Sequence, residues 1–146
     1  MLLRATVDAS VFVSAVRTSE RRAAESRELL SALRLRAVPL IEPALLPVEV
    51  SAALRRGTGD APLAVRTAAA LAALPHLSLA ALDSATWREA AEMAAEHGLR
   101  GSDAVYVATA LRYAATLVTL DSEQLERSPE AVEACTPIVA LKRLGS

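Results

Sequence analysis

The chain contains very few of the residues that form disulfides, zinc sites and aromatic cores. It has one cysteine, Cys135, which cannot form an internal disulfide, and only two histidines, which disfavours a zinc site. Aromatic residues make up 3% of the chain and hydrophobic residues 53%, so a core of Ala, Leu and Val is expected. Charges interrupt every apolar run before the roughly 20 residues of a membrane span, and the first residues lack a signal-peptide pattern. We therefore expect a cytoplasmic protein with no membrane segment.

Lysine is also nearly absent, since Lys142 is the only one and the other fifteen basic residues are arginines. The net charge of −1 means that the protein as a whole does not attract nucleic acid. Arginine suits bidentate phosphate contacts and stacking on bases, but a coding bias would give the same composition. Several arginines lie near the acidic positions in sequence. They could contact metal or RNA, or they could lie on solvent-exposed helix faces, and the sequence does not decide between these roles for Arg17, Arg21, Arg22, Arg55, Arg56 and Arg100.

Short apolar runs alternate with amphipathic segments along the chain. This alternation predicts a three-layer α/β/α fold with a short, mainly parallel sheet of about five strands. Residues 1–146 contain no repeat or linker, which indicates one domain. Helices are expected to end at Gly57 and to begin at a Ser102 cap. The expected strands are 2–7, 38–41, 76–82, 116–120 and 137–141, and the expected helices are 11–17, 20–36, 44–56, 62–74, 84–97, 103–115 and 122–127.

Four acidic residues lie in stretches that are otherwise mostly apolar. Asp8 follows the run LLRATV, and Asp121 follows TLVTL. Glu49 interrupts ALLPVEVSAAL, and Asp103 opens DAVYVATAL. The carboxyl ends of parallel strands meet at one edge of a sheet, so these acids are expected to gather there. Buried carboxylates are costly without a partner, and a magnesium-type ion is the usual one.

Each acid also has a simpler structural explanation. Asp8 and Asp121 could cap the helices that follow them, and Asp103 could favour the dipole of its helix from the first turn. Glu49 is harder to explain in this way, because at helical spacing it shares an inward face with Leu45 and Leu46 and has no Lys or His nearby in sequence. One site accounts for all four acids more simply than four coincidental caps.

Four segments together carry a family resemblance. VDASVFVSA, PVEVSAALRR, SDAVYVATA and LVTLDSE, in this order over nearly the whole chain, resemble PIN-domain ribonucleases, especially the VapC-type toxins of bacterial toxin–antitoxin pairs. The resemblance implies that Asp8, Glu49, Asp103 and Asp121 are the family's four site acids. It also places Thr119 at the position of the threonine that often precedes the fourth acid.

The chain departs from the family pattern after Asp121. The segment SEQLERSPE lacks the aromatic residue that many relatives have there. Glu123 in this segment is either an additional ligand or a charge on the helix face, and we favour the helix face. Tyr106, one turn beyond Asp103, is assigned to core packing, although it could line the site.

The ligand types and the resemblance together imply a chemistry. Carboxylates favour Mg²⁺ or Mn²⁺, with Asp8 and Asp103 as direct ligands and Asp121 completing the shell or binding a second ion. Glu49 would hold and deprotonate the attacking water. The resemblance implies that the substrate is single-stranded RNA, cut endonucleolytically. It further implies a homodimer that is held inactive by a cognate antitoxin.

Other classes of protein remain as alternatives. A response-regulator receiver or a small phosphatase would also use Mg²⁺ on such a sheet. A receiver, however, has a paired acid at its first strand and a lysine late in the sheet. Asp8 lacks an acidic neighbour, and Lys142 comes too late. An inactive PIN-like domain that serves as a binding scaffold is the other alternative, and a purely structural α/β module is the last.

Overall fold

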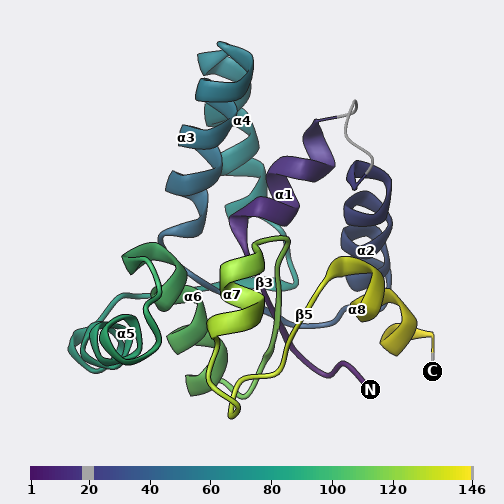
Figure 1. Ribbon diagram of the computed structural model, residues 1–146. Helices are drawn as coiled ribbons and strands as arrows, with labels where there is room; N and C mark the ends of the chain where they lie inside the picture. The colour runs from purple at the N-terminus through teal and green to yellow at the C-terminus, as the bar shows by residue number, and fades with distance from the viewer. Residues whose placement is uncertain (18–21, 146) are drawn as a thin grey trace.

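The computed structural model describes residues 1–17 and 22–145, so the predicted role of Arg21 lies outside the described residues. Within these ranges the chain forms a five-stranded sheet and eight helices (Figure 1). The elements are β1 (Ala5–Val7), α1 (Ala9–Val16), α2 (Ala23–Leu35), β2 (Leu40–Pro43), α3 (Leu46–Thr58), α4 (Ala61–Ala72), β3 (Leu77–Ala80), α5 (Ser84–His97), α6 (Gly101–Arg112), β4 (Thr116–Val118), α7 (Ser122–Arg127), β5 (Ala134–Cys135) and α8 (Pro137–Leu144).

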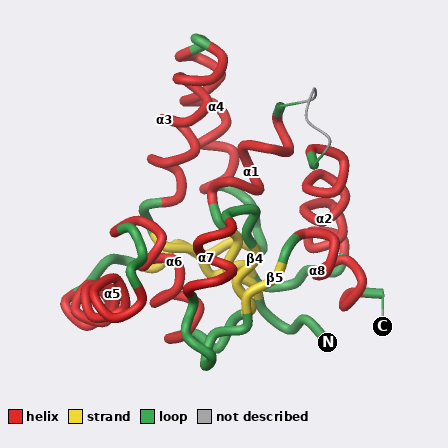
Figure 2. The backbone as a smooth tube through the Cα atoms, viewed as in Figure 1, coloured by secondary structure: helices red, strands yellow, loops and turns green. Residues whose placement is uncertain are grey.

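The sheet has the strand order β3-β2-β1-β4-β5, and all of its pairings are parallel. From β1 the chain moves outward to β2 and β3, then returns to the other side of β1 for β4 and β5. Right-handed crossovers in opposite directions place helices on opposite faces of the sheet. The α6 helix packs against β1, β2 and β4, whereas α2 packs against α1 and α8 (Figure 2). The predicted three-layer α/β fold is therefore confirmed.

The reversal of direction beside β1 matters for the position of the acids. Ligands of open parallel sheets bind beyond the carboxyl ends of the strands, where neighbouring connections leave in opposite directions. Asp8 follows β1 directly, and Asp121 comes three residues after the end of β4. The adjacent pairing of β1 with β4 thus brings two acids from distant parts of the sequence to the same edge.

The core consists mainly of aliphatic side chains, as the composition predicts. Leu29, Leu33, Leu46, Leu54 and Leu117 have no exposed surface. Within the described ranges, no helix has both the length and the apolar character needed to cross a membrane.

The prediction of a last strand over 137–141 is wrong. The last strand is β5, two residues long, and the apolar segment after it forms α8. Pro137 stands in the first turn of this helix, where a missing N–H costs nothing. The buried residues Pro137, Ala140 and Leu144 follow helical spacing, while Ile138 is 40% exposed. An apolar run of five residues fits either structure, and packing against α2 favours the helix.

Two of the helix ends that were predicted at a named residue also differ from the prediction. The α6 helix begins at Gly101 after an extended Arg100, so Ser102 lies inside the first turn and is not the cap. The α3 helix continues through Gly57 and ends at Gly59, whose φ of 72° is the left-handed conformation of a C-terminal stop. The sequence shows that two glycines lie near the end of this helix. Which of them adopts the left-handed conformation and ends the helix depends on packing.

Ala114, just before β4, adopts the same left-handed conformation without being glycine, with φ 50° and an exposed side chain. Ala114→Gly is expected to raise the free energy of unfolding by up to about 1 kcal/mol, because glycine has no Cβ to clash there. Urea denaturation at pH 7 measures the change. Ala69→Gly, on the exposed face of α4, serves as the control and should lower stability by about 1 kcal/mol. Equal losses in both variants would contradict the strain at Ala114.

Candidate functional site

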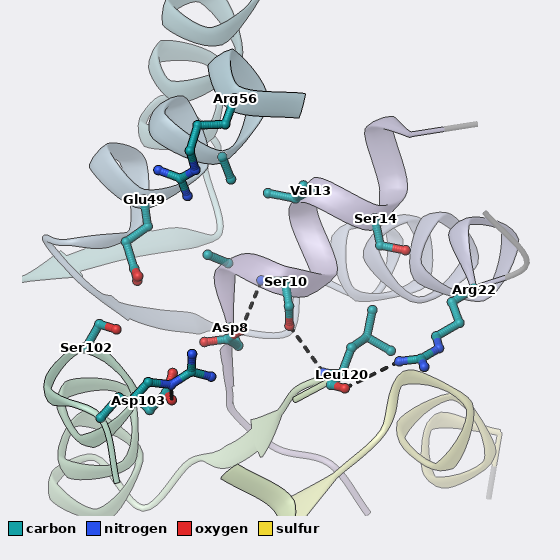
Figure 3. A pocket seen from close by; sticks show the side chains of 13 residues that line it. Asp8, Ser10, Val13, Ser14, Arg22, Glu49, Arg56, Ser102, Asp103 and Leu120 are labelled. Carbon is teal, nitrogen blue, oxygen red and sulfur yellow. Dashed lines mark hydrogen bonds and ion pairs between the residues drawn. The ribbon is translucent and has the colours of Figure 1, made fainter. Parts of the chain in front are cut away.

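A groove of about 750 Å³ opens at the carboxyl edge of the sheet. Three of the four predicted acids, Asp8, Glu49 and Asp103, line it. Figure 3 shows Glu49 reaching down from α3 toward Asp8 at the end of β1, with Asp103 on α6 below. The rest of the lining consists of Ala9, Ser10, Val13, Ser14, Arg22, Ala53, Arg56, Arg100, Ser102 and Leu120.

Asp8 is buried, and both of its carboxylate oxygens accept hydrogen bonds. Oδ2 accepts from the backbone N–H of Ser10 at 3.0 Å, so Asp8 caps α1. Oδ1 accepts from Nε2 of Gln124 at 3.3 Å. The cap and the site are therefore compatible explanations of this residue. The helix start holds one oxygen in place and thereby sets the direction in which the carboxylate points.

Asp121 also divides its two oxygens between a cap and the site. Oδ1 accepts from the backbone N–H groups of Glu123 at 2.8 Å and Gln124 at 3.1 Å, which caps α7. Oδ2 instead accepts from Nη2 of Arg100 at 3.0 Å. The predicted capping role is confirmed, and one oxygen of this carboxylate still faces the neighbouring acids.

Asp103, Asp121 and Glu123 form the tightest group of acids among the described residues. One carboxylate oxygen from each lies within 4.8 Å of the others. Glu123 lies in the first turn of α7 and forms an ion pair with Arg127 of the same helix, which agrees with the favoured interpretation as a helix-face charge. Its position in the acidic group leaves the additional-ligand role as a prediction. Asp8 is not part of this group and faces it through Gln124.

The environment raises the pKa of two of the groove acids. Burial raises the pKa of Asp103 to about 6, the charges of Asp121 and Asp8 add to the effect, and Arg100 partly offsets it. Burial also raises the pKa of Glu49, with the hydroxyl of Tyr106 opposing and the charge of Asp8 adding to the shift. Both shifts mean that negative charge is disfavoured in the groove, so the groove favours a positive partner.

Gln124 holds the acids together and was not found from the sequence. Its side chain is fully buried. Besides the bond to Asp8, Nε2 donates to the backbone carbonyl of Asp103 at 3.4 Å, and Oε1 accepts from Oγ1 of Thr119 at 2.6 Å. The Thr119 hydroxyl in turn accepts from the N–H of Asp121 at 3.0 Å. Gln124 lies in the segment that departs from the family pattern, and that departure was the available signal.

Glu42 in β2 is an acid that the sequence analysis missed. It has no exposed surface, and Oε1 accepts from the backbone N–H of Val7 at 2.6 Å. Thr6 donates its hydroxyl to the Ile41 carbonyl at 2.8 Å, so side chains complete the pairing of β1 and β2 next to Asp8. Burial raises the pKa of Glu42 well above its ordinary value, against the opposing bond from Val7.

The predicted arginines separate into two groups. Arg22, Arg56 and Arg100 line the groove, and Nη1 of Arg22 donates to the Leu120 carbonyl at 3.4 Å. Arg17 lies against Gly57 of α3, and Arg55 lies with Val48 and Val65 on the surface of α3 and α4.

The donors present fit a hard divalent cation. All three members of the tightest group are carboxylates, and their oxygens are close enough for one ion to contact more than one of them. Magnesium and manganese bind such oxygens, whereas zinc and copper sites usually contain nitrogen or sulfur. The residues therefore match the predicted type of metal.

The architecture and groove define a small parallel α/β domain with an acidic site at its switch point. The model of the PIN domain family matches residues 5–129. The chain belongs to the PIN domain family, as the four sequence segments indicated. Comparison with curated protein sequences finds no match.

Several solved structures have the same fold. VapC20 of Mycobacterium tuberculosis, described as a sarcin–ricin loop cleaving toxin, superposes with a TM-score of 0.73 at 16% identity, over 88% of this chain and 98% of that one. PAE2754 of Pyrobaculum aerophilum gives 0.69 at 24% identity, over 99% and 97%. VapBC2 of Rickettsia felis, solved with promoter DNA, gives 0.69 at 13% identity, over 90% and 97%.

Glu42 yields a prediction that depends on pH. A carboxyl whose pKa is raised by folding binds its proton more tightly in the folded state, so stability falls as pH rises above the ordinary value of 4.5. Glu42→Gln cannot ionise and should lose less stability than the parent between pH 5 and pH 9, as measured by urea denaturation. Glu42→Leu leaves the Val7 N–H unpaired and should lose about 1–3 kcal/mol at pH 5. If the free energy of unfolding of the parent and of Glu42→Gln changed with pH in the same way, the raised pKa of Glu42 would be refuted.

Proposed function

We propose that the protein is a metal-dependent endoribonuclease and the toxin of a VapBC-type toxin–antitoxin pair. The observation that carries the proposal is the gathering of Asp8, Glu49 and Asp103 in one groove of a PIN domain, with Asp121 and Glu123 close to Asp103. An inactive scaffold would not need to keep several carboxylates together, because their repulsion destabilises the metal-free fold.

RNA as the substrate is supported by the groove arginines. Arg22, Arg56 and Arg100 place positive charge along a groove whose acids would otherwise repel phosphates. One guanidinium group can donate two hydrogen bonds to the oxygens of a phosphate, and such contacts do not depend on the base sequence. The description of VapC20 as a toxin that cleaves the sarcin–ricin loop supports RNA further. A protein of net charge −1 would thus bind RNA through a local basic rim and not through its overall charge.

The roles of the acids follow from their positions. Asp103 and Asp121 would hold Mg²⁺ or Mn²⁺, with Asp8 and Glu123 within reach of the same region. When bound, the ion would polarise the phosphodiester and acidify a bound water. Glu49 faces the groove from α3, and burial raises its pKa, which makes it a better acceptor for a proton of the attacking water. Gln124 and Thr119 would keep Asp8 and Asp121 in position.

The partners follow from the same resemblance. The structure of VapBC2 bound to a DNA fragment from its promoter supports a cognate antitoxin for this chain. We further propose a homodimer and a cytoplasmic location, where an RNA-cleaving toxin meets its substrate. Light scattering at micromolar concentration tests the dimer.

The metal prediction tests the proposed function directly. Millimolar Mn²⁺ should raise the melting temperature of the parent, because only the folded state assembles the ligands. The purified protein should cut single-stranded RNA with Mg²⁺ or Mn²⁺ and stop when EDTA is added. Asp103→Asn should lose both the thermal shift and the cleavage.

Ala69→Gly, far from the groove, is the matched control and should keep the thermal shift despite its lower stability. A melting temperature that does not change with Mn²⁺ would count against the metal site. A Mn²⁺-induced shift without cleavage of any RNA tested would favour the inactive scaffold.

Glu49 allows catalysis to be separated from a structural role. Glu49→Gln keeps the shape of the side chain but cannot ionise. Because folding raises the pKa of the Glu49 carboxyl, its ionised form destabilises the fold, so the metal-free variant should be at least as stable as the parent above pH 4.5. Cleavage should fall by orders of magnitude, and the growth arrest caused by expression without antitoxin should disappear. Melting and cleavage measured on the same preparations decide between the roles. A variant that is destabilised by about 1 kcal/mol or more, but whose folded fraction still cuts RNA, would mark Glu49 as structural.

A further inference from the structure

Arg100 contacts the same acids that the proposed function assigns to the metal. Its Nε lies 3.2 Å from Oδ2 of Asp103, and its Nη2 lies 3.0 Å from Oδ2 of Asp121. Nε is also 3.8 Å from Oε2 of Glu123. One guanidinium therefore bridges all three members of the tightest acidic group in the described part of the chain.

The position of Arg100 allows the guanidinium to leave without unfolding the site. Arg100 is the extended residue directly before α6, whereas Asp103 lies in the first turn of the helix. The side chain is 68% exposed, whereas that of Asp103 is only 13% exposed. The acids are thus held by the fold, and the cation that neutralises them is attached by a flexible chain at the rim.

Arg56 provides a comparison within the same groove. It lines the groove on the α3 side, is exposed, and makes no ion pair within 4 Å among the described residues. Both arginines add one positive charge near the acids, but only Arg100 contacts the carboxylate oxygens themselves. If removal of Arg100 changes metal affinity more than removal of Arg56 does, the difference comes from the direct contacts of Arg100 with the carboxylates and not from the loss of one positive charge in the groove.

A divalent ion bound to Oδ2 of Asp103 and Oδ2 of Asp121 would lie close to the guanidinium that now contacts these two oxygens, and the two positive charges would repel each other. We propose, on the basis of the proposed metal-dependent function, that Arg100 is a built-in counter-cation of the metal-free site. It neutralises Asp103 and Asp121 until Mg²⁺ or Mn²⁺ displaces it. Metal binding then includes the cost of breaking these contacts, so Arg100 weakens metal affinity while it stabilises the metal-free fold.

The test measures Mn²⁺ binding to the full-length protein at pH 7.5 by isothermal titration calorimetry, without RNA. Arg100→Gln should bind Mn²⁺ about five- to tenfold more tightly than the parent, because no contact to Asp103 and Asp121 has to be broken. Arg56→Gln, which removes the same charge, should change the affinity by less than about twofold. Arg100→Gln should also melt at a lower temperature than the parent without metal and at a similar temperature when saturated with Mn²⁺.

Two results would overturn the inference while leaving the proposed function intact. One is equal Mn²⁺ affinity for the parent and Arg100→Gln, and the other is weaker affinity for Arg100→Gln. A folded parent that binds no Mn²⁺ would defeat the proposed function and the inference together. Should Arg100→Gln fail to fold, the parent itself supplies the measurement. The Nε–H NMR signal of Arg100, and not that of Arg56, should shift on saturation with Mg²⁺, and an unchanged Arg100 signal overturns the proposal.

Discussion

Carboxylates that share one edge of a sheet must each find a hydrogen-bond donor or a cation, and the arrangement of the groove follows from that need. Asp8 uses one oxygen to cap α1 and the other to accept from Gln124. Asp121 caps α7 with Oδ1 and turns Oδ2 to Arg100. Asp103 is left with Arg100 and a pKa raised to about 6. Backbone N–H groups and Gln124 thus bind Asp8 and one oxygen of Asp121, whereas a cation, Arg100, binds the other oxygen of Asp121 and Asp103.

The topology of the sheet makes this concentration of charge possible. The strands β1 and β4 are adjacent in the sheet although more than a hundred residues separate them in the chain. Their carboxyl ends carry Asp8 and Asp121, and α6 packs across β1 and β4 so that Asp103 reaches the same place. The α3 helix brings Glu49 from the opposite side of the groove (Figure 3). Asp8 and Asp121 are fixed as caps of α1 and α7, and Glu49 and Asp103 lie within α3 and α6, so the carboxylates stay close despite their repulsion.

The polar groups beneath the groove are as much a part of the site as the acids above it. Gln124 connects Thr119, Asp8 and the backbone of Asp103 in one buried network, within the segment where the chain departs from its family's pattern. Glu42 accepts a hydrogen bond from the backbone N–H of Val7, the residue directly before Asp8. The hydrogen bonds of Gln124 restrict side-chain motion, because each broken bond would leave an unpaired group in a dry interior.

The sequence alone was sufficient to predict the alternation of strands and helices and the parallel sheet, since hydrophobic periodicity is a local signal. The resemblance of four segments identified the family. Of the four acids proposed for the site, the structure brings Asp8, Glu49 and Asp103 into one groove and places Asp121 beside Asp103. The sequence did not separate a strand from a helix in PIVAL, because a short apolar run fits both until α2 provides a packing surface. It also overlooked Gln124, Glu42 and the bridging position of Arg100. Those roles depend on which side chains meet across the sheet edge, and distances between residues far apart in sequence exist only in the folded chain.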